Sequence, residues 1–244
     1  MSFEFLDSDF VLLCGGKGTR FKKISTDLPK VLTKFGDNTY LEYILKKCMY
    51  YKIKEITLAV GHLHNKIIHF LNENKFNIKI NLSIENESLG TWGAIVNAKK
   101  FINKDLFYVM NGDTLNTLNL SSGLRYYNKN DFDALLFGSR VNEKIDLDYG
   151  YISSDKMHLV NSFAEKKISK KNVLFKNSGI YLLNKKLIKE FGQQKKSSLE
   201  RDILPMMVEK KTIGIYNQNI RFFDFGTYER YNLINKNYDI LQWI

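Results

Sequence analysis

The chain has 244 residues, 44% of them hydrophobic and 14% aromatic, so it can bury a full core, and intrinsic disorder is excluded. Two cysteines are too few for a disulfide framework or a cysteine-based zinc site, and no apolar run approaches the ~18 residues that span a bilayer. The formal net charge is +11, but the basic residues are scattered rather than gathered in one stripe, which argues against nucleic-acid binding.

The first half of the chain alternates between predicted strands and helices. An apolar run at 10–14 predicts a buried parallel strand, and a loop rich in glycine and basic residues follows at 15–29. Helices are then expected at 40–50, 65–71 and 91–100, between strands at 56–60, 78–84 and 106–110. This order predicts an α/β fold, in which a mostly parallel mixed sheet is flanked by helices in one Rossmann-like domain over residues 1–244.

The second half is more mixed. Strands are expected at 134–140, 149–153, 173–183, 212–216 and 221–225. Helices are expected at 198–208, despite Pro205, and at 228–241. On a parallel sheet, ligands bind beyond the carboxyl ends of the strands, where the loops after Cys14 and Met110 lie. We therefore expect the site at this edge.

The loop after the first strand has the sequence GGKGTR at 15–20. Glycines let backbone N–H groups approach phosphates, and Arg20 and Lys30 offer cations nearby. No register supplies a Walker A motif, and Phe21 stands where a Rossmann fingerprint needs a small residue. The alternative is a glycine turn with incidental basic residues.

Together with LPKVL at 28–32, this loop resembles the signature of the sugar-1-phosphate nucleotidyltransferases, which is G-G-x-G-T-R, a short spacer and P-K-x-L. The resemblance covers nearly the whole chain. It implies an enzyme that transfers a nucleoside monophosphate from an NTP to a sugar 1-phosphate and releases pyrophosphate, with Mg²⁺ as cofactor. The N-terminal half would bind the nucleotide and the C-terminal half the sugar phosphate.

Further motifs carry the same resemblance. ESLGTWGA at 87–94 resembles the base- and ribose-binding loop, with Trp92 where the family has Ala or Gly, so that Trp92 would narrow the loop or stack nearby. NGDT at 111–114 and DFGT at 224–227 resemble the two metal-carboxylate motifs. YG at 149–150, FAEK at 163–166 and NSGIY at 177–181 resemble sugar-binding segments, and Lys167 replaces a proline usual in the second.

The resemblance assigns residues to roles. The nucleotide-binding residues would be Leu13, Gly15, Gly16, Gly18, Thr19, Glu87, Leu89, Gly90, Thr91 and Gly112. The sugar-phosphate-binding residues would be Gly150, Glu165, Lys166, Asn177 and Gly179. The catalytic residues would be Arg20, Lys30, Asp113 and Lys166, with Asp113 and Asp224 as metal ligands.

Asp113 and Asp224 each end an apolar strand. An isolated Asp in that place is more often a turn residue, but two such carboxylates can hold Mg²⁺ together with substrate phosphates. By the resemblance, Arg20 would neutralise the β- and γ-phosphates, Lys30 the transferring phosphoryl or leaving group, and Lys166 the sugar phosphate. A sugar phosphate is already ionised at neutral pH, so no general base is needed and catalysis rests on positioning and charge neutralisation.

Leu89-Gly90-Thr91 looks most like the guanylyl group of the family, so GTP is the expected NTP. Among compact guanylyl members, the chain most resembles the D-glycero-D-manno-heptose 1-phosphate guanylyltransferases of capsule and surface-layer synthesis. Mannose 1-phosphate is the second candidate for the sugar substrate. N-acetylmuramic acid 1-phosphate, with UTP as the NTP, is the third.

Other classes of protein remain open at this point. A non-catalytic nucleotide sensor is one, although Arg20, Lys30, Asp113 and Asp224 occur together. The net charge fits either a lysine-rich solvated surface or attraction of anionic substrates. We expect neither a nucleic-acid nor a membrane partner, and homo-oligomerisation stays open. Residues 1–10 lack the basic n-region of a signal peptide, so a cytoplasmic protein is expected.

Overall fold

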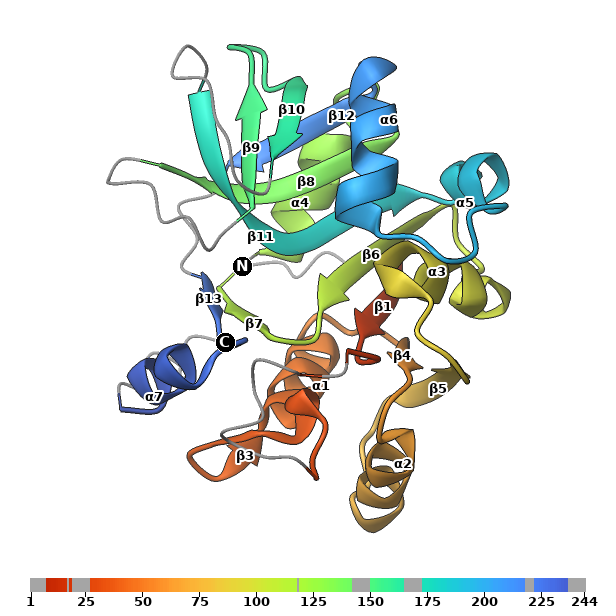
Figure 1. Cartoon of the computed structure of the whole chain (residues 1–244), viewed down its shortest axis with the longest axis vertical. Coiled ribbons are helices and arrows are strands. Elements are labelled where there is room, and N and C mark those ends of the chain that lie inside the picture. Colours follow the sequence, from red (N-terminus) through yellow and green to blue (C-terminus); the bar gives the residue numbers. More distant parts are fainter. Residues whose placement is uncertain are drawn as a thin grey trace.

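A nine-stranded mixed sheet forms the centre of the computed structural model, which describes residues 8–16, 18, 27–117, 119–141, 150–164, 173–217 and 222–236 (Figure 1). Its strands are β1 (Asp9–Leu13), β4 (Glu55–Val60), β5 (Lys79–Ile84), β6 (Leu106–Asn111), β8 (Ala134–Arg140), β9 (Tyr151–Ser154), β10 (Val160–Ala164), β11 (Val173–Asn184) and β12 (Ile213–Asn217). They lie in the order β10-β9-β11-β6-β1-β4-β5, and β8 lies between β11 and β12.

The sheet is mostly parallel, as predicted. Strands β4, β1 and β6 are parallel neighbours, β5 is parallel to β4, and β12 is parallel to β8. Strand β11 is antiparallel to β6, β8 and β9, and β10 is antiparallel to β9. Among the strands of this sheet that the structure describes, β10 and β11 therefore run against all the others.

Helices cover both faces of the sheet. Apolar residues of α1 (Tyr40–Tyr50), α2 (His64–Glu73), α4 (Leu120–Tyr127) and α7 (Tyr228–Lys236) belong to one core cluster. Residues of α3 (Gly90–Asn97), α5 (Lys186–Phe191) and α6 (Leu204–Glu209) belong to the other. In β1, Phe10 and Leu12 face the first cluster and Val11 the second, which explains why this strand is a continuous apolar run.

Short elements connect the layers. They are the 3₁₀ helices η2 (Lys30–Leu32) and η3 (Ala98–Phe101), the π-helical turn η4 (Leu199–Ile203), the pair β2 (Lys34–Phe35) and β3 (Asn38–Thr39), and the pair β7 (Thr114–Asn116) and β13 (Phe222–Asp224). No helix within the described ranges is long and apolar enough to cross a membrane.

Strand β11 passes from one neighbour to another along its length. Its residues 173–176 pair with β9 and its residues 180–184 pair with β6, while its register with β8 shifts between Asn177 and Tyr181. Gly179, at this shift, has a φ of +69°, a conformation that glycine adopts without strain. The sheet therefore forks between the ends of β6 and β9, with residues 177–179 at the fork.

The structure corrects several details of the predicted elements. The helix expected at 198–208 is divided into η4 and α6, because Pro205 lies in the first turn of α6, where its missing N–H costs nothing. Strands β2, β3, β7 and β10, the 3₁₀ helix η2 and helices α4 and α5 were not predicted. For the helix expected at 228–241, α7 is described as far as Lys236, and residues 237–241 lie outside the described residues.

Helix α1 is anchored to β7 by two buried polar side chains. The hydroxyl of Tyr40 lies 3.1 Å from the carbonyl oxygen of Asn111 and 2.9 Å from that of Thr114. The ammonium of Lys47, whose residue is 6% exposed, donates to the carbonyl oxygen of Asn116 at 2.8 Å and to its Oδ1 at 2.7 Å. These contacts hold the turn between β6 and β7 against the helix.

The burial of Lys47 predicts a pH-dependent stability. Burial lowers its pKa to about 7, whereas an unfolded chain keeps a lysine protonated up to about pH 10.4. Between these values the unfolded state binds more protons, so the free energy of unfolding should rise with pH by up to ~1.4 kcal/mol per pH unit from this residue. Urea unfolding of the wild type and Lys47→Met at pH 6, 7.5 and 9 measures the difference.

The exposed neighbour Lys46 provides the matched control, as Lys46→Met. The unfolding free energy of the wild type minus that of Lys47→Met should rise with pH. The corresponding difference for Lys46→Met should stay constant. A constant difference for Lys47→Met would contradict the assignment.

Candidate active site

A cavity of about 240 Å³ opens at the carboxyl ends of β1 and β6, beside the start of α3. Its lining is formed by Leu13, Cys14, Gly15, Gly16, Lys30, Val31, Glu85, Ser88, Gly90, Thr91, Ala94, Asn111, Gly112 and Asp113. This is the edge of the sheet at which the sequence predicted the site.

The carboxylate of Glu85 packs against two glycines at the end of β1 and β4. A Cβ atom on Gly15 would lie 2.5 Å from Oε1 of Glu85, and one on Gly61 would lie 2.6 Å from the same atom. The N–H of Leu89 donates to Oε2 of Glu85 at 3.4 Å. Burial raises the pKa of Glu85, and the N–H of Leu89 partly offsets this effect. Glycine at both positions thus leaves room for a carboxylate at the cavity.

Helix α3 begins at the cavity, in close contact with residues 195–198. Gly90 has a φ of +76°, and a Cβ there would lie 2.4 Å from the carbonyl oxygen of Ser197. That oxygen accepts the N–H of Trp92 at 3.0 Å. Trp92 neither narrows the cavity nor stacks in it, which corrects the expectation from sequence. Its indole is fully buried on the other side of α3, where Nε1 donates to the carbonyl oxygen of Phe191 at 3.1 Å.

The side chain of Thr91 faces both the cavity and the neighbouring turn η4. Its hydroxyl donates to Oε2 of Glu200 at 2.6 Å and accepts the N–H of Leu199 at 2.8 Å. The hydroxyl proton of Thr91 is therefore committed to Glu200, and Thr91 joins the start of α3 at the cavity to the turn η4.

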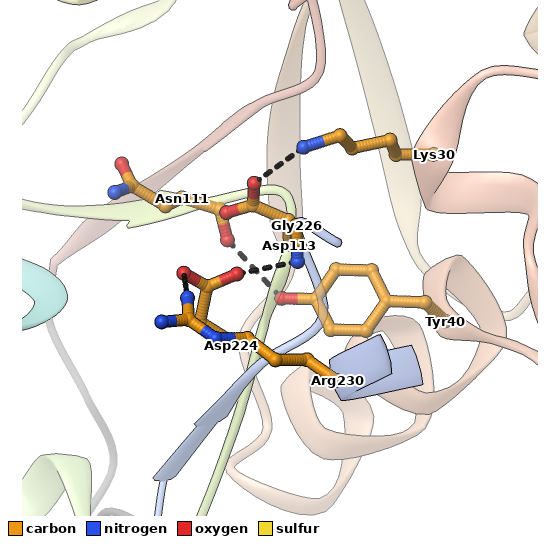
Figure 2. Close-up of polar contacts among 7 residues, drawn as sticks. All are labelled: Lys30, Tyr40, Asn111, Asp113, Asp224, Gly226 and Arg230. Atoms are coloured by element: carbon orange, nitrogen blue, oxygen red, sulfur yellow. Dashed lines mark hydrogen bonds and ion pairs between the residues drawn. The ribbon is translucent and has the colours of Figure 1, made fainter. Parts of the chain in front are cut away.

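The carboxylates of Asp113 and Asp224 each have a cationic partner (Figure 2). Nζ of Lys30 lies 2.9 Å from Oδ2 of Asp113, and Nη1 of Arg230 lies 2.8 Å from Oδ2 of Asp224. The N–H of Gly226 donates to Oδ1 of Asp224 at 2.5 Å. Burial, followed by the negative charge of Asp113, raises the pKa of Asp224 despite these contacts. The two carboxylates are thus close enough to repel each other.

Gly226 marks the point at which these side chains converge. A Cβ atom on Gly226 would lie 2.8 Å from Oδ1 of Asp224, 3.5 Å from Nζ of Lys30 and 3.6 Å from Oδ2 of Asp113. The backbone fixes this arrangement, because β7 pairs with β13 and the N–H of Phe225 donates to the carbonyl oxygen of Asp113 at 3.0 Å.

A second cavity of about 110 Å³ lies at the fork between β6 and β9. Its lining is formed by Asn111, Asp113, Thr114, Gly150, Asn177, Ser178, Gly179, Phe222 and Asp224. Asn111 and Asp113 line both cavities, so the two adjoin at the end of β6. Two ligands can therefore meet beside Asp113.

Most described residues that the sequence nominated line one of the cavities. In the first cavity these are Leu13, Gly15, Gly16, Lys30, Gly90, Thr91, Gly112 and Asp113, and in the second they are Asp113, Gly150, Asn177, Gly179 and Asp224. Gly18, Glu87 and Leu89 are absent from both linings. Glu87 is exposed, and its carboxylate pairs with Nζ of Lys196 at 2.6 Å. Thr19, Arg20, Tyr149, Glu165, Lys166 and Lys167 lie outside the described residues.

Sequence reasoning missed several polar residues of the linings, among them Glu85 and Asn111. Glu85 stands two residues before Glu87, at the end of β5, and is the glutamate that reaches the first cavity. Asn111 precedes the Gly-Asp pair, and its Oδ1 is buried without a hydrogen-bond partner among the described residues. A polar residue at the end of a predicted strand was the available signal in both cases.

The comparison with known proteins identifies the family. The pattern of the nucleotidyl transferase family matches residues 10–240. The chain belongs to this family. This nucleotidyl transferase is 39% identical over 191 residues to a D-glycero-alpha-D-manno-heptose 1-phosphate guanylyltransferase of Campylobacter jejuni, an alignment that covers 78% of this chain and 82% of the relative. It is 28% identical over 222 residues to a mannose-1-phosphate guanyltransferase of Pichia angusta, covering 88% of this chain and 60% of that protein.

Solved structures agree with this assignment. The nucleotidyl transferase superposes on HddC from Yersinia pseudotuberculosis with a TM-score of 0.79 and 32% identity, covering 95% of this chain and 99% of the other. A second crystal structure of HddC, complexed with GMP-PN, gives a TM-score of 0.78 and 33% identity.

The convergence at Gly226 predicts the effect of one added methyl group. Gly226→Ala should push Oδ1 of Asp224 away from Lys30 and Asp113, because the new Cβ would lie 2.8 Å from that oxygen. Pyrophosphate release should fall about 10²-fold, the typical effect of displacing a catalytic group by ~1 Å. An unchanged thermal melt would show that the fold is retained, and an unchanged rate in a folded variant would contradict the geometry.

Proposed function

We propose that this nucleotidyl transferase transfers GMP from GTP to D-glycero-α-D-manno-heptose 1-phosphate and releases pyrophosphate. The relative of C. jejuni, named for this activity, and the fold shared with HddC over 95% of the chain support the proposal. The first cavity would hold the nucleotide and the second the sugar phosphate, so that the two substrates meet at Asp113. The product would be a nucleotide sugar for capsule polysaccharide.

The carboxylate of Glu85 in the first cavity is the observation that carries the choice of guanine. A carboxylate only accepts hydrogen bonds. The Watson–Crick edge of guanine offers two adjacent donors, N1–H and N2–H, whereas uracil and thymine offer one donor between two acceptors. Among the described residues, no lysine or arginine pairs with Glu85, and the N–H of Leu89 at 3.4 Å uses one lone pair of Oε2, so the carboxylate keeps lone pairs that a base can use.

The site also fits Mg²⁺. Asp113 and Asp224 converge at Gly226, and two carboxylates together with substrate phosphates are a usual binding mode for this ion. Among the described residues no third His, Cys, Asp or Glu joins them, which agrees with a metal that needs the substrates to complete its shell. When bound, Mg²⁺ would neutralise phosphate charge.

The remaining chemistry needs positioning rather than proton transfer. An oxygen of the sugar phosphate forms a bond with the α-phosphorus of GTP, and the bond from that phosphorus to pyrophosphate breaks, with the electron pair leaving on pyrophosphate. The ammonium of Lys30 beside Asp113 would stabilise charge on the transferring phosphoryl group. We assign the nucleotide to the first cavity through the glycines at 15, 16 and 90 and through Gly112.

Three alternative hypotheses remain for the function. Mannose 1-phosphate would replace the heptose phosphate, as the name of the relative from P. angusta suggests. N-acetylmuramic acid 1-phosphate with UTP would need the base to bind without guanine's two donors. A non-catalytic sensor would bind nucleotide without turnover. We place the reaction in the cytoplasm, where Cys14 and Cys48 would stay the free thiols that the structure contains.

Pyrophosphate release with Mg²⁺ tests the proposal directly. Each of the common NTPs is paired with a panel of sugar 1-phosphates that includes the heptose phosphate, mannose 1-phosphate and N-acetylmuramic acid 1-phosphate. We expect the highest kcat/KM with GTP and the heptose phosphate, and a loss of at least ~10²-fold in Asp113→Asn, which removes a charge aimed at the reacting phosphates. Turnover with another pair would replace the substrates, and no turnover with any pair would favour the sensor.

The role of Glu85 predicts a change of base preference. In Glu85→Gln one acceptor becomes a donor that faces a donor of guanine, so kcat/KM for GTP should fall about 10- to 100-fold. The amide pairs better with the edge of uracil, which offers one donor between two acceptors. The ratio of kcat/KM for GTP to kcat/KM for UTP should therefore fall by more than kcat/KM for GTP alone. Steady-state kinetics with both NTPs measures this ratio.

The matching variant Glu87→Gln tests which glutamate contacts the base, Glu87 as the sequence predicted or Glu85 as the lining of the cavity indicates. If Glu85 contacts the base, Glu85→Gln alters the ratio and Glu87→Gln does not. If only Glu87→Gln alters it, Glu87 contacts the base and the assignment of Glu85 fails.

A further inference from the structure

Glu200 lies between the two cavities without lining either of them. It belongs to η4, and its carboxylate accepts three hydroxyl groups. Oε2 accepts the hydroxyls of Thr91 at 2.6 Å and of Ser198 at 3.0 Å, and Oε1 accepts the hydroxyl of Tyr181 at 3.2 Å. A single carboxylate therefore joins α3, η4 and β11.

These hydrogen bonds have a fixed direction. Because a carboxylate only accepts, the protons of Thr91 and Tyr181 both point at Glu200. Burial and then the charge of Glu200 hold the pKa of Tyr181 well above its usual value, so its phenol keeps its proton. The phenol oxygen then accepts Nδ2 of Asn177 at 2.8 Å, and Oδ1 of Asn177 accepts the N–H of Gly179 at 3.2 Å.

The chain of hydrogen bonds runs from one cavity to the other. Thr91 lines the first cavity, and Asn177 and Gly179 line the second. The orientation of the Asn177 amide is set by its partners, since Nδ2 faces Tyr181 and Oδ1 faces the N–H of Gly179. Glu200 thus fixes the proton of Tyr181, and Tyr181 and Gly179 together set which atoms of Asn177 a ligand in the second cavity meets.

The backbone around Glu200 supports a positioning role. A π-helical turn is rare and often occurs at functional sites. Here the turn is tied to α3, because Leu199 N–H donates to Oγ1 of Thr91 and the carbonyl oxygen of Ser197 accepts Trp92 N–H. It is closed by Asp202, whose Oδ2 accepts the N–H of Ser198 at 2.6 Å. The turn and the start of α3 are therefore held together, with Glu200 facing β11.

We propose that Glu200 is a positioning residue that couples the two cavities, so that occupation of one strengthens binding in the other. The proposal rests on the proposed function only in naming a nucleotide for the first cavity and a sugar phosphate for the second. Its physical basis is that one carboxylate holds both linings: a ligand that orders Thr91 against Glu200 also orders Tyr181 and Asn177, so less ordering is left for the second ligand. Coupling between the cavities is reciprocal.

The test uses guanosine 5′-(α,β-methylene)triphosphate, which cannot release pyrophosphate. The coupling factor is the ratio of the Kd values of the heptose 1-phosphate without and with a saturating amount of this analogue, measured by calorimetry with Mg²⁺. We expect a factor of at least five in the wild type. Glu200→Gln and Tyr181→Phe should each lower it at least threefold, and Glu190→Gln should leave it unchanged. Glu190 is the control because its carboxylate pairs with Lys210, away from both cavities.

The affinities of each ligand for the free enzyme separate this role from a general loss of structure, because they do not contain the coupling. Tyr181→Phe breaks the link to Asn177 and leaves the link between Thr91 and Glu200. The Kd of the heptose 1-phosphate alone should therefore rise about tenfold, while the Kd of the GTP analogue alone changes less than twofold. Thermal melts check that the variants are folded.

Two outcomes overturn the proposal: an unchanged coupling factor in folded Glu200→Gln, or an equal rise in Tyr181→Phe of the two Kd values that are measured with each ligand alone. If another NTP or sugar phosphate proves to be the substrate, the proposed function fails. The coupling factor, measured with the NTP analogue and sugar phosphate that prove to be the substrates, then still tests the role of Glu200.

Discussion

The repulsion between Asp113 and Asp224 is the constraint on which the rest of the site depends. Two carboxylates come together at Gly226 only because each is held elsewhere, Asp113 by Lys30 and Asp224 by Arg230. The pairing of β7 with β13 brings the two segments together across more than a hundred residues of sequence. Helix α1 then fixes β7 from behind, at the cost of burying Lys47. A cation between the carboxylates would relieve the repulsion that the backbone imposes.

The long strand β11 explains why two cavities adjoin. Pairing first with β9 and then with β6, it opens a fork at residues 177–179, and the second cavity occupies this fork beside the end of the first. The register shift against β8 and the positive φ of Gly179 allow the strand to change neighbours without a break. The same segment carries Asn177 and Tyr181, so the fork also receives the hydrogen bonds that start at Glu200.

Local patterns predicted the parallel half of the sheet, because buried strands such as 10–14 and 106–110 are continuous apolar runs and the motifs stand at their ends. They did not predict which neighbouring glutamate faces the cavity. Glu85 and Glu87 are both glutamates that shortly precede Gly90 in the sequence, and the packing of Glu85 against Gly15 and Gly61 distinguishes them. Trp92 occupies a motif position, yet packing against Phe191 turns it into the core. Both outcomes depend on tertiary contacts that one sequence does not contain.

The charge of the side chains that line the two cavities indicates that the site needs further cations to bind a triphosphate. Although the chain carries a net charge of +11, the acidic and basic side chains that line the cavities, among the described residues, are one lysine and three carboxylic acids, namely Lys30, Glu85, Asp113 and Asp224. Such a lining repels a triphosphate unless further cations join it. Mg²⁺ between the aspartates and the basic residues expected from sequence at positions 20 and 166 would supply that charge. Because Mg²⁺ binds through substrate phosphates as well as carboxylates, metal and nucleotide would then bind together, each lowering the cost of the other.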